Sequence, residues 1–192
     1  SLTTLDDSEL LSGLGEVVKH GVLGDADLFA LCRNHATNVR QPDVMSELVS
    51  RSVALKASIV AQDEKESGLR AVLNLGHTVG HAIEKVAMDC GVPIPHGICV
   101  AMGVHAEVHW AEVMGACPAG TAKSVSDVMT GLGLPLRPKR VDFEALIRAV
   151  KFDKKVRRGK LATAVVEDIG RVRLVEIYET DIPSMFHSLE DG

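Results

Sequence analysis

Apolar residues recur at intervals of three and four along most of the chain, which is the spacing of one face of an α-helix. The run ELLSGLGEVVKHGVLG shows this pattern, and it follows Asp6, Asp7 and Ser8, residue types that cap helices. Together with the glycines and prolines that interrupt it, the pattern predicts helices over residues 8–24, 25–38, 42–63, 70–88, 97–114, 121–132 and 142–151. We therefore expect a mainly helical protein.

The pattern changes after Lys160. The stretch LATAVVEDIGRVRLVEI alternates apolar and polar residues around Asp168 and Gly170, which is the signature of a β-hairpin. Residues 89–95, DCGVPIP, hold two prolines and a glycine, and they predict a loop that places His96 at the start of the next helix. No repeat and no interdomain linker is evident, so residues 1–192 are predicted to form one mainly α domain with a small β-hairpin near its end.

The composition is that of a soluble globular protein, with 46% hydrophobic and 24% charged residues. No apolar run approaches the roughly 20 residues that cross a bilayer, so we expect no membrane role. A net charge of −5 and 3% aromatic residues argue against nucleic acid as a partner, because nucleic acids are bound through basic patches and stacking platforms. Four widely spaced cysteines without a CxxC pair favour a reducing, cytoplasmic location. The lack of an initiator Met leads us to expect a piece of a longer chain or a processed one.

Two histidine pairs have the spacing of one helical turn. His77 and His81 lie in RAVLNLGHTVGHAIE, each directly after a glycine, and their imidazoles could converge on one metal ion. His105 and His109 have the same spacing without other support, and we interpret them as part of a helix face. Spacing alone is weak evidence, because histidines four apart also occur on ordinary helix surfaces.

Glu16 is a carboxylate in an otherwise apolar helical stretch, three residues before Lys19. A partly exposed salt bridge between the two would explain it, since an unpaired buried carboxylate is costly. Alternatively, Glu16 is the carboxylate ligand of a metal whose imidazole ligands come from the stretch 70–84 and from His96. Two histidines and one carboxylate with an open position make a catalytic zinc site, which polarises a hydroxyl or carbonyl of a substrate.

Several cations are dispersed in the sequence and could gather in one cleft. Each alone is typical of a solvated surface, but a cluster would attract a small anionic substrate even to an acidic protein. These cations are Lys19, Lys56, Arg70, Lys154 and Lys155. A dinucleotide-binding loop is not evident, because Gly13 and Gly15 are followed by Val18 where the third glycine belongs and no strand precedes them. We therefore expect no cofactor-binding residues for NAD in this chain.

Four segments in this order closely resemble the C-terminal domain of the 3-dehydroquinate synthase family, a branch of the sugar-phosphate cyclases. They are SGLGEVVKHG, KASIVAQDEKESGLRAVLNLGHTVGHAIE, PHG and DKKVRRGKL. The resemblance runs over about residues 5–175, and the block 56–84 is its most specific part. It implies a helical C-terminal metal- and substrate-binding domain, from which the family's N-terminal NAD-binding domain is absent.

The resemblance also implies an activity. Members of the family are zinc- and NAD-dependent lyases of the shikimate pathway, which convert 3-deoxy-arabino-heptulosonate 7-phosphate into 3-dehydroquinate and phosphate. Co²⁺ would suit the same ligands as Zn²⁺. The implied partners are a small anionic sugar phosphate, the N-terminal NAD domain and, for the full-length protein, a second copy in a homodimer. Without the NAD domain the chain is expected to be inactive.

Two other functions stay open. One is another sugar-phosphate cyclase of the inosose or valiolone type, although Asn74 and His81 favour the dehydroquinate branch. The other is a catalytically inactive helical metal-binding domain, although a purely structural site would not require the set of pocket cations.

Taken position by position, the resemblance implies three metal ligands, which are Glu16, His77 and His96. The residues that it implies for substrate binding are Lys19, Lys56, Glu66, Arg70, Leu73, Asn74, His81, Lys154 and Lys155. Those expected to act in catalysis are Lys19, Lys56, Arg70, Asn74, His81 and Lys154, of which Lys154 is favoured over Lys155 as the contact to phosphate. Three positions depart from the family pattern, Gly15, Val79 and Ile98. Ile98 replaces an acidic residue, and we expect it to alter the surroundings of the metal.

Overall fold

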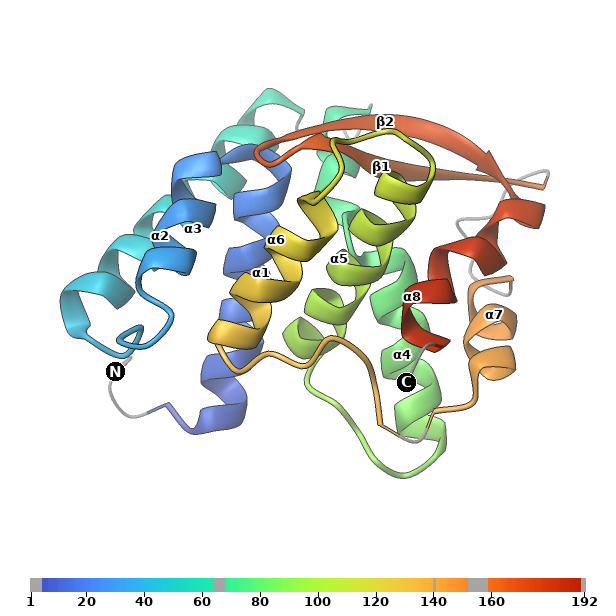
Figure 1. Ribbon diagram of the computed structural model, residues 1–192, viewed down its shortest axis with the longest axis horizontal. Coiled ribbons are helices and arrows are strands. Elements are labelled where there is room, and N and C mark those ends of the chain that lie inside the picture. Colours follow the sequence, from blue (N-terminus) through green and yellow to red (C-terminus); the bar gives the residue numbers. More distant parts are fainter. Residues whose placement is uncertain (1–4, 64–67, 140, 152–158, 191–192) are drawn as a thin grey trace.

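The computed structural model describes residues 5–63, 68–139, 141–151 and 159–190. Helices make up most of this part of the chain (Figure 1). They are α1 (Asp7–Gly24), α2 (Ala26–Asn34), α3 (Pro42–Gln62), η2 (Leu69–Asn74, a 3₁₀ helix), α4 (His77–Asp89), α5 (His96–Val113), α6 (Thr121–Gly131), α7 (Phe143–Lys151), η3 (Glu179–Phe186, 3₁₀) and α8 (His187–Glu190). The two strands, β1 (Lys160–Asp168) and β2 (Arg171–Tyr178), pair antiparallel. The predicted fold class, mainly α with a small hairpin near the end, is confirmed.

Two predicted helices need correction, and two helical segments were not predicted. The stretch 70–88 is not one helix, because Gly76 adopts a left-handed conformation with φ 76° and separates the 3₁₀ helix η2 from α4. The second helix ends at Asn34 rather than at residue 38. The segments η3 and α8, after the hairpin, were not predicted; they bury Ile182, Met185 and Phe186 although Pro183 lies inside η3.

Helix α5 is the centre of the fold. It is buried on nearly all sides and packs against α1, α4 and α6 (Figure 1). A helix that is apolar all round is typical of a protein core. The hairpin lies across one end of α1 and α5, and the N–H of Gly170 in its turn donates to the carbonyl of Val22 at 2.8 Å. None of the described helices is long and apolar enough to cross a membrane.

Glycines let α1 and α4 approach α5 closely. A Cβ at Gly97 would lie 1.9 Å from the carbonyl oxygen of Ser12 in α1, and one at Gly103 would lie 1.9 Å from that of Gly76. Any larger residue would force the helices apart. The beginnings of α4 and α5 therefore lie beside the middle of α1, and this places His77 and His96 next to Glu16.

Candidate metal centre and substrate cleft

A cleft of about 820 Å³ opens beside these helix ends. It is bordered by α1, α3, η2 and the first residues of α4 and α5. The predicted site residues that border it are Glu16, Lys19, Lys56, Arg70, Leu73, Asn74, His77 and His96. His20, Ser52, Val53 and Ala71 border it too and were not anticipated. Residues far apart in the sequence thus meet at one place.

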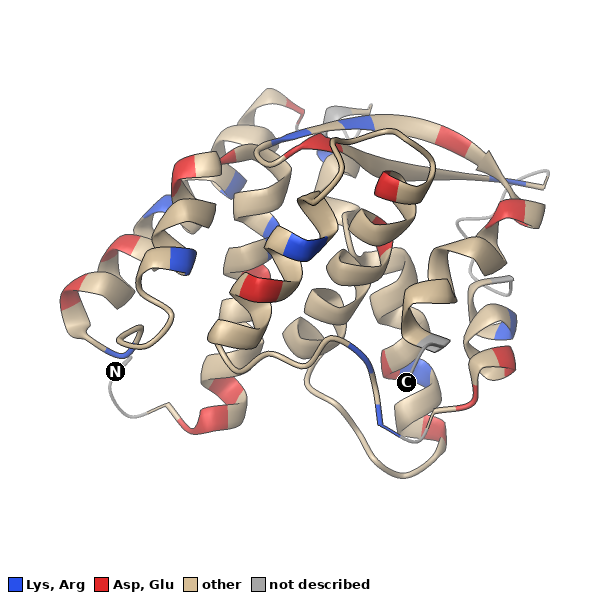
Figure 2. Cartoon of the chain, in the orientation of Figure 1, with Lys and Arg blue, Asp and Glu red and all other residues tan. Residues whose placement is uncertain are grey.

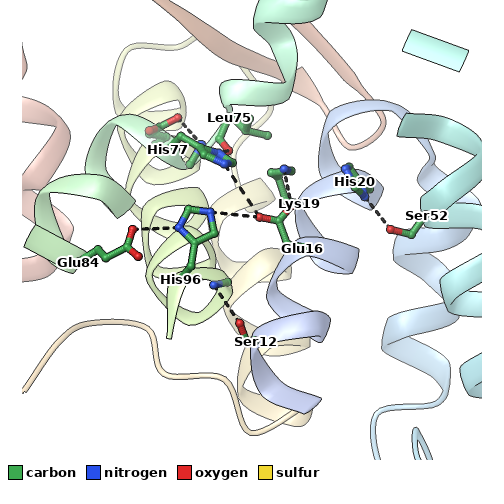
Figure 3. Close-up of polar contacts among 12 residues, drawn as sticks. Ser12, Glu16, Lys19, His20, Ser52, Leu75, His77, Glu84 and His96 are labelled. Atoms are coloured by element: carbon green, nitrogen blue, oxygen red, sulfur yellow. Dashed lines mark hydrogen bonds and ion pairs between the residues drawn. The ribbon is translucent and has the colours of Figure 1, made fainter. Parts of the chain in front are cut away.

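Glu16 lies between the two histidines and Lys19 (Figure 3). Its Oε2 accepts a hydrogen bond from Lys19 Nζ at 2.5 Å. Its Oε1 is 4.0 Å from Nε2 of His77 and 3.8 Å from Nε2 of His96. Burial raises the pKa of Glu16, but the Lys19 ammonium and His77 outweigh it, so that the pKa lies below its ordinary value. Glu16 is therefore an ionised carboxylate with one oxygen directed at both imidazoles.

Both histidines are held by their other ring nitrogen. Nδ1 of His77 lies 3.2 Å from the carbonyl oxygen of Leu75, and Nδ1 of His96 lies 2.9 Å from Oε2 of Glu84. When Nδ1–H donates to these oxygens, each Nε2 keeps its lone pair for a metal. Burial, followed by the charge of Lys19, lowers the pKa of His77 to about 4. The imidazole of His77 is therefore neutral at pH 7, as a metal ligand must be.

The donor set fits Zn²⁺ or Co²⁺. Two imidazole nitrogens and a carboxylate oxygen converge, and both imidazoles have the hydrogen-bond partner that metal-binding histidines ordinarily have. The predicted salt bridge between Glu16 and Lys19 is also present, because the same carboxylate contacts the Lys19 ammonium. The two readings of Glu16 are compatible, since each uses a different oxygen.

His81 lies close to the same point. Its ring centroid is 5.2 Å from that of His77 and 5.6 Å from that of His96, and one nitrogen from each of the three rings lies within 4.8 Å of the others. By distance alone His81 is a further candidate ligand. It is not among the residues that border the cleft. Its predicted contact with substrate therefore stays a prediction.

The cations of the cleft come from three elements. Lys19 in α1 is 3% exposed, and burial together with Lys56 lowers its pKa despite the opposing charge of Glu16. Lys56 is on the exposed face of α3. Arg70 lies in the first turn of η2, where its N–H and that of Gly68 each donate to Oδ2 of the buried Asp63 at 2.9 Å. Figure 2 shows acidic and basic residues interspersed over the helices, so a positive field at the cleft depends on this local cluster.

Other predicted residues are placed differently or are not placed. Glu66, Lys154 and Lys155 lie outside the described residues. Ile98 is buried in the core, and the carboxylate beside Nδ1 of His96 is that of Glu84. Glu84 was missed, although it lies seven residues after His77 and thus on the same helical face. Glu107, which contacts the first turn of α4, was missed as well and had no local signal.

Comparison with known proteins identifies the family. A family model described as 3-dehydroquinate synthase C-terminal matches residues 13–156. The chain belongs to this family. The resemblance read from the sequence is therefore confirmed, and the matched residues include all three predicted metal ligands.

Curated 3-dehydroquinate synthases are similar to nearly the whole chain. The enzyme of Dehalococcoides mccartyi strain CBDB1 is 34% identical over 98% of this chain, and that of Caulobacter vibrioides is 39% identical over 88%. The matches cover 53% and 47% of those two proteins. The chain thus spans about half the length of the curated 3-dehydroquinate synthases that it matches.

Solved structures of related cyclases share the fold. A 2-epi-5-epi-valiolone synthase from Streptomyces hygroscopicus, with NAD⁺ and Zn²⁺ bound, matches with a TM-score of 0.84 at 24% identity, over 98% of this chain and 53% of its own. A 2-deoxy-scyllo-inosose synthase complexed with carbaglucose-6-phosphate, NAD⁺ and Co²⁺ matches with a TM-score of 0.81 at 18% identity, over 97% of this chain and 54% of its own. At these identities the likeness shows the fold alone. NAD⁺ with Zn²⁺ or Co²⁺ in those proteins matches the cofactors that the resemblance implied.

Proposed function

We propose that this chain is the metal- and substrate-binding half of a 3-dehydroquinate synthase. The reaction is the conversion of 3-deoxy-arabino-heptulosonate 7-phosphate into 3-dehydroquinate and phosphate, in the cytoplasmic shikimate pathway. The observation that carries the proposal is the convergence of Glu16 Oε1 with Nε2 of His77 and of His96 beside a cluster of cations. A purely structural metal site would not require cations beside the ligands.

The chain's own residues divide the work. Glu16, His77 and His96 would hold Zn²⁺ or Co²⁺, which as a Lewis acid polarises a hydroxyl or carbonyl oxygen of the substrate. Lys19, Lys56 and Arg70 would bind the carboxylate and phosphate groups of the substrate. Arg70 can donate two parallel hydrogen bonds to one oxyanion, whereas the lysines act as point charges.

The remaining predicted residues complete the pocket. Asn74 and His81 would donate to or accept from substrate hydroxyls, Leu73 would form pocket wall, and the predicted roles of Glu66, Lys154 and Lys155 are part of the same proposal. NAD would be bound by an N-terminal half, so the 192 residues alone are expected to be inactive. We expect the full-length protein to be a homodimer.

The test is phosphate release by the complete protein, expressed with whatever sequence flanks these residues. Release from the heptulosonate phosphate should require both NAD and metal, and a chelator should abolish it. A carboxylate-free sugar phosphate tests the competing inosose or valiolone activity, because that substrate leaves part of the cation cluster without a partner. Release from the carboxylate-free compound alone would assign the chain to another cyclase branch. Absence of release from both substrates, in a folded and metal-loaded protein, would refute a cyclase activity.

The ligand assignment has a separate test. His77→Ala and His96→Ala should each abolish high-affinity Zn²⁺ binding in a competition titration with a chromophoric chelator. His81→Ala should retain most of the affinity while it weakens substrate binding. An equal loss of metal affinity in all three variants would make His81 a ligand and contradict its proposed contact with substrate.

A further inference from the structure

A buried carboxylate of α5 contacts the beginning of the helix that carries His77. Glu107 is 2% exposed. Its Oε2 accepts a hydrogen bond from the N–H of Gly76 at 2.8 Å, and its Oε1 accepts one from the N–H of Val79 at 3.4 Å. Gly76 is the N-cap residue of α4 and makes no side-chain cap. Glu107 therefore acts as the cap from 31 residues away, and its charge lies at the positive end of the helix dipole.

The same peptide group that Glu107 contacts also holds the metal-ligand candidate. The N–H of Gly76 and the carbonyl of Leu75 belong to one planar unit. That carbonyl oxygen lies 3.2 Å from Nδ1 of His77, whose Nε2 is turned toward Glu16 (Figure 3). A single rigid group thus links the Glu107 carboxylate to the imidazole. A hydrogen bond from the N–H to a carboxylate also polarises the peptide and makes its carbonyl a stronger acceptor.

His96 offers a comparison within the site. Its Nδ1 contacts the Glu84 carboxylate directly, at 2.9 Å. Partners of this kind fix the tautomer and the orientation of a metal-binding imidazole and raise its basicity. His77 has a carbonyl in that position, and behind the carbonyl is the carboxylate of Glu107.

We propose that Glu107 is a positioning residue for the metal centre: it fixes the peptide group between Leu75 and Gly76 and thereby orients the His77 ring for metal binding. The inference rests on the proposed metal site and goes beyond it, because Glu107 is neither a ligand nor a residue that borders the cleft.

A matched control lies on the same helix. Oε2 of Glu112 accepts a hydrogen bond from the N–H of Ala122 at 2.7 Å, in the first turn of α6, whose N-cap residue is also a glycine without a side-chain cap. Glu112 thus caps a neighbouring helix in the same manner, but α6 carries no predicted ligand. Glu112→Gln should weaken a helix cap of the same kind, at a smaller cost in stability because Glu112 is half-buried, and leave the metal site unchanged.

The experiment measures Zn²⁺ affinity by chelator competition, and the visible absorption of bound Co²⁺, in the complete protein. In Glu107→Gln the amide nitrogen replaces one acceptor oxygen and the charge is lost. We expect about a ten-fold weaker Zn²⁺ affinity and an altered Co²⁺ band, with both unchanged in Glu112→Gln. In a His77→Ala background Glu107→Gln should have no further effect on the weak metal binding that remains.

Two results would overturn the inference. One is wild-type metal affinity in Glu107→Gln, and the other is an equal loss in Glu112→Gln, which would make the effect one of general stability. If Glu107→Gln does not fold, Glu107→Asp serves instead, because it keeps the charge but is one methylene short, and its affinity should also fall. A wild-type protein that binds neither Zn²⁺ nor Co²⁺ would overturn the proposed metal site itself, and this inference with it.

Discussion

The close approach of α1 and α5 can be tested with one methyl group. In Gly97→Ala the new Cβ would lie 1.9 Å from the carbonyl oxygen of Ser12, whereas ordinary contact begins at 3.4 Å. The start of α5 must therefore move away from α1 by about 1.5 Å. The hydrogen bond from the N–H of Gly97 to Ser12 Oγ, 3.1 Å long, would be lost in the same movement.

The cost has three parts. Overpacking of this kind costs about 1–3 kcal/mol, and the lost hydrogen bond about 1 kcal/mol. The greater helix preference of alanine offsets this loss of stability by at most about 1 kcal/mol. We therefore expect Gly97→Ala to lower the free energy of unfolding by about 2 kcal/mol. Since His96 precedes the substituted residue and faces Glu16 at 3.8 Å, the movement should also weaken Zn²⁺ binding by at least about ten-fold.

The assays are urea unfolding in the presence of a chelator and chelator competition for Zn²⁺. Gly13→Ala is the control, because Gly13 follows Ser12 in α1 but has nothing within 4 Å of the new Cβ. It should leave metal affinity unchanged and raise stability by up to about 1 kcal/mol. The argument from close packing is refuted if Gly97→Ala matches wild type in both assays.

Two further predictions concern titration and the partner of His96. Burial lowers the pKa of His20 and of His105 from 6.5 to about 4, so protonation favours the unfolded state. The free energy of unfolding should have its full value above pH 6.5, fall by about 2 kcal/mol per group at pH 5 and level off below pH 4. In His105→Gln the urea midpoint should fall less steeply as the pH is lowered, and a fall as steep as in the wild type would contradict this prediction. Glu84→Gln should weaken Zn²⁺ binding about ten-fold, because it removes the carboxylate that contacts Nδ1 of His96. Lys85→Gln, at the adjacent exposed position, should leave the affinity unchanged. Equal Zn²⁺ affinities in the two variants would show that Glu84 does not support His96.

Periodicity alone placed most of the helices and the hairpin correctly, and it failed where a single backbone angle decided the structure. The stretch RAVLNLGHTVGHAIE has continuous helical spacing, yet Gly76 at φ 76° interrupts it. Apolar spacing carries no information on φ, and a glycine permits both signs. The helical turns of η3 were not predicted; they form after the hairpin with Pro183 inside them.

Some residues of the candidate site could be identified from the sequence, and others could be found only in the structure. Glu16, His77 and His96 were identified as potential ligands by residue type and by resemblance, and the structure brings them together. Glu84 could have been found from its spacing to His77. Glu107 could not, because it reaches Gly76 across 31 residues of sequence and only through the packing of α5 against α4.

The sequence by itself determined the helical class, the hairpin, the family and the set of donor residues, because helical hydrogen bonds and apolar spacing are local. Only the tertiary structure decided which oxygen of Glu16 contacts Lys19 and which faces the imidazoles, what holds each histidine ring, and how His81 lies relative to the ligands. Those features depend on how closely helices distant in sequence approach one another. That approach is set by the absence of a Cβ at Gly97 and Gly103, whose effect appears only when the partner backbone is in place.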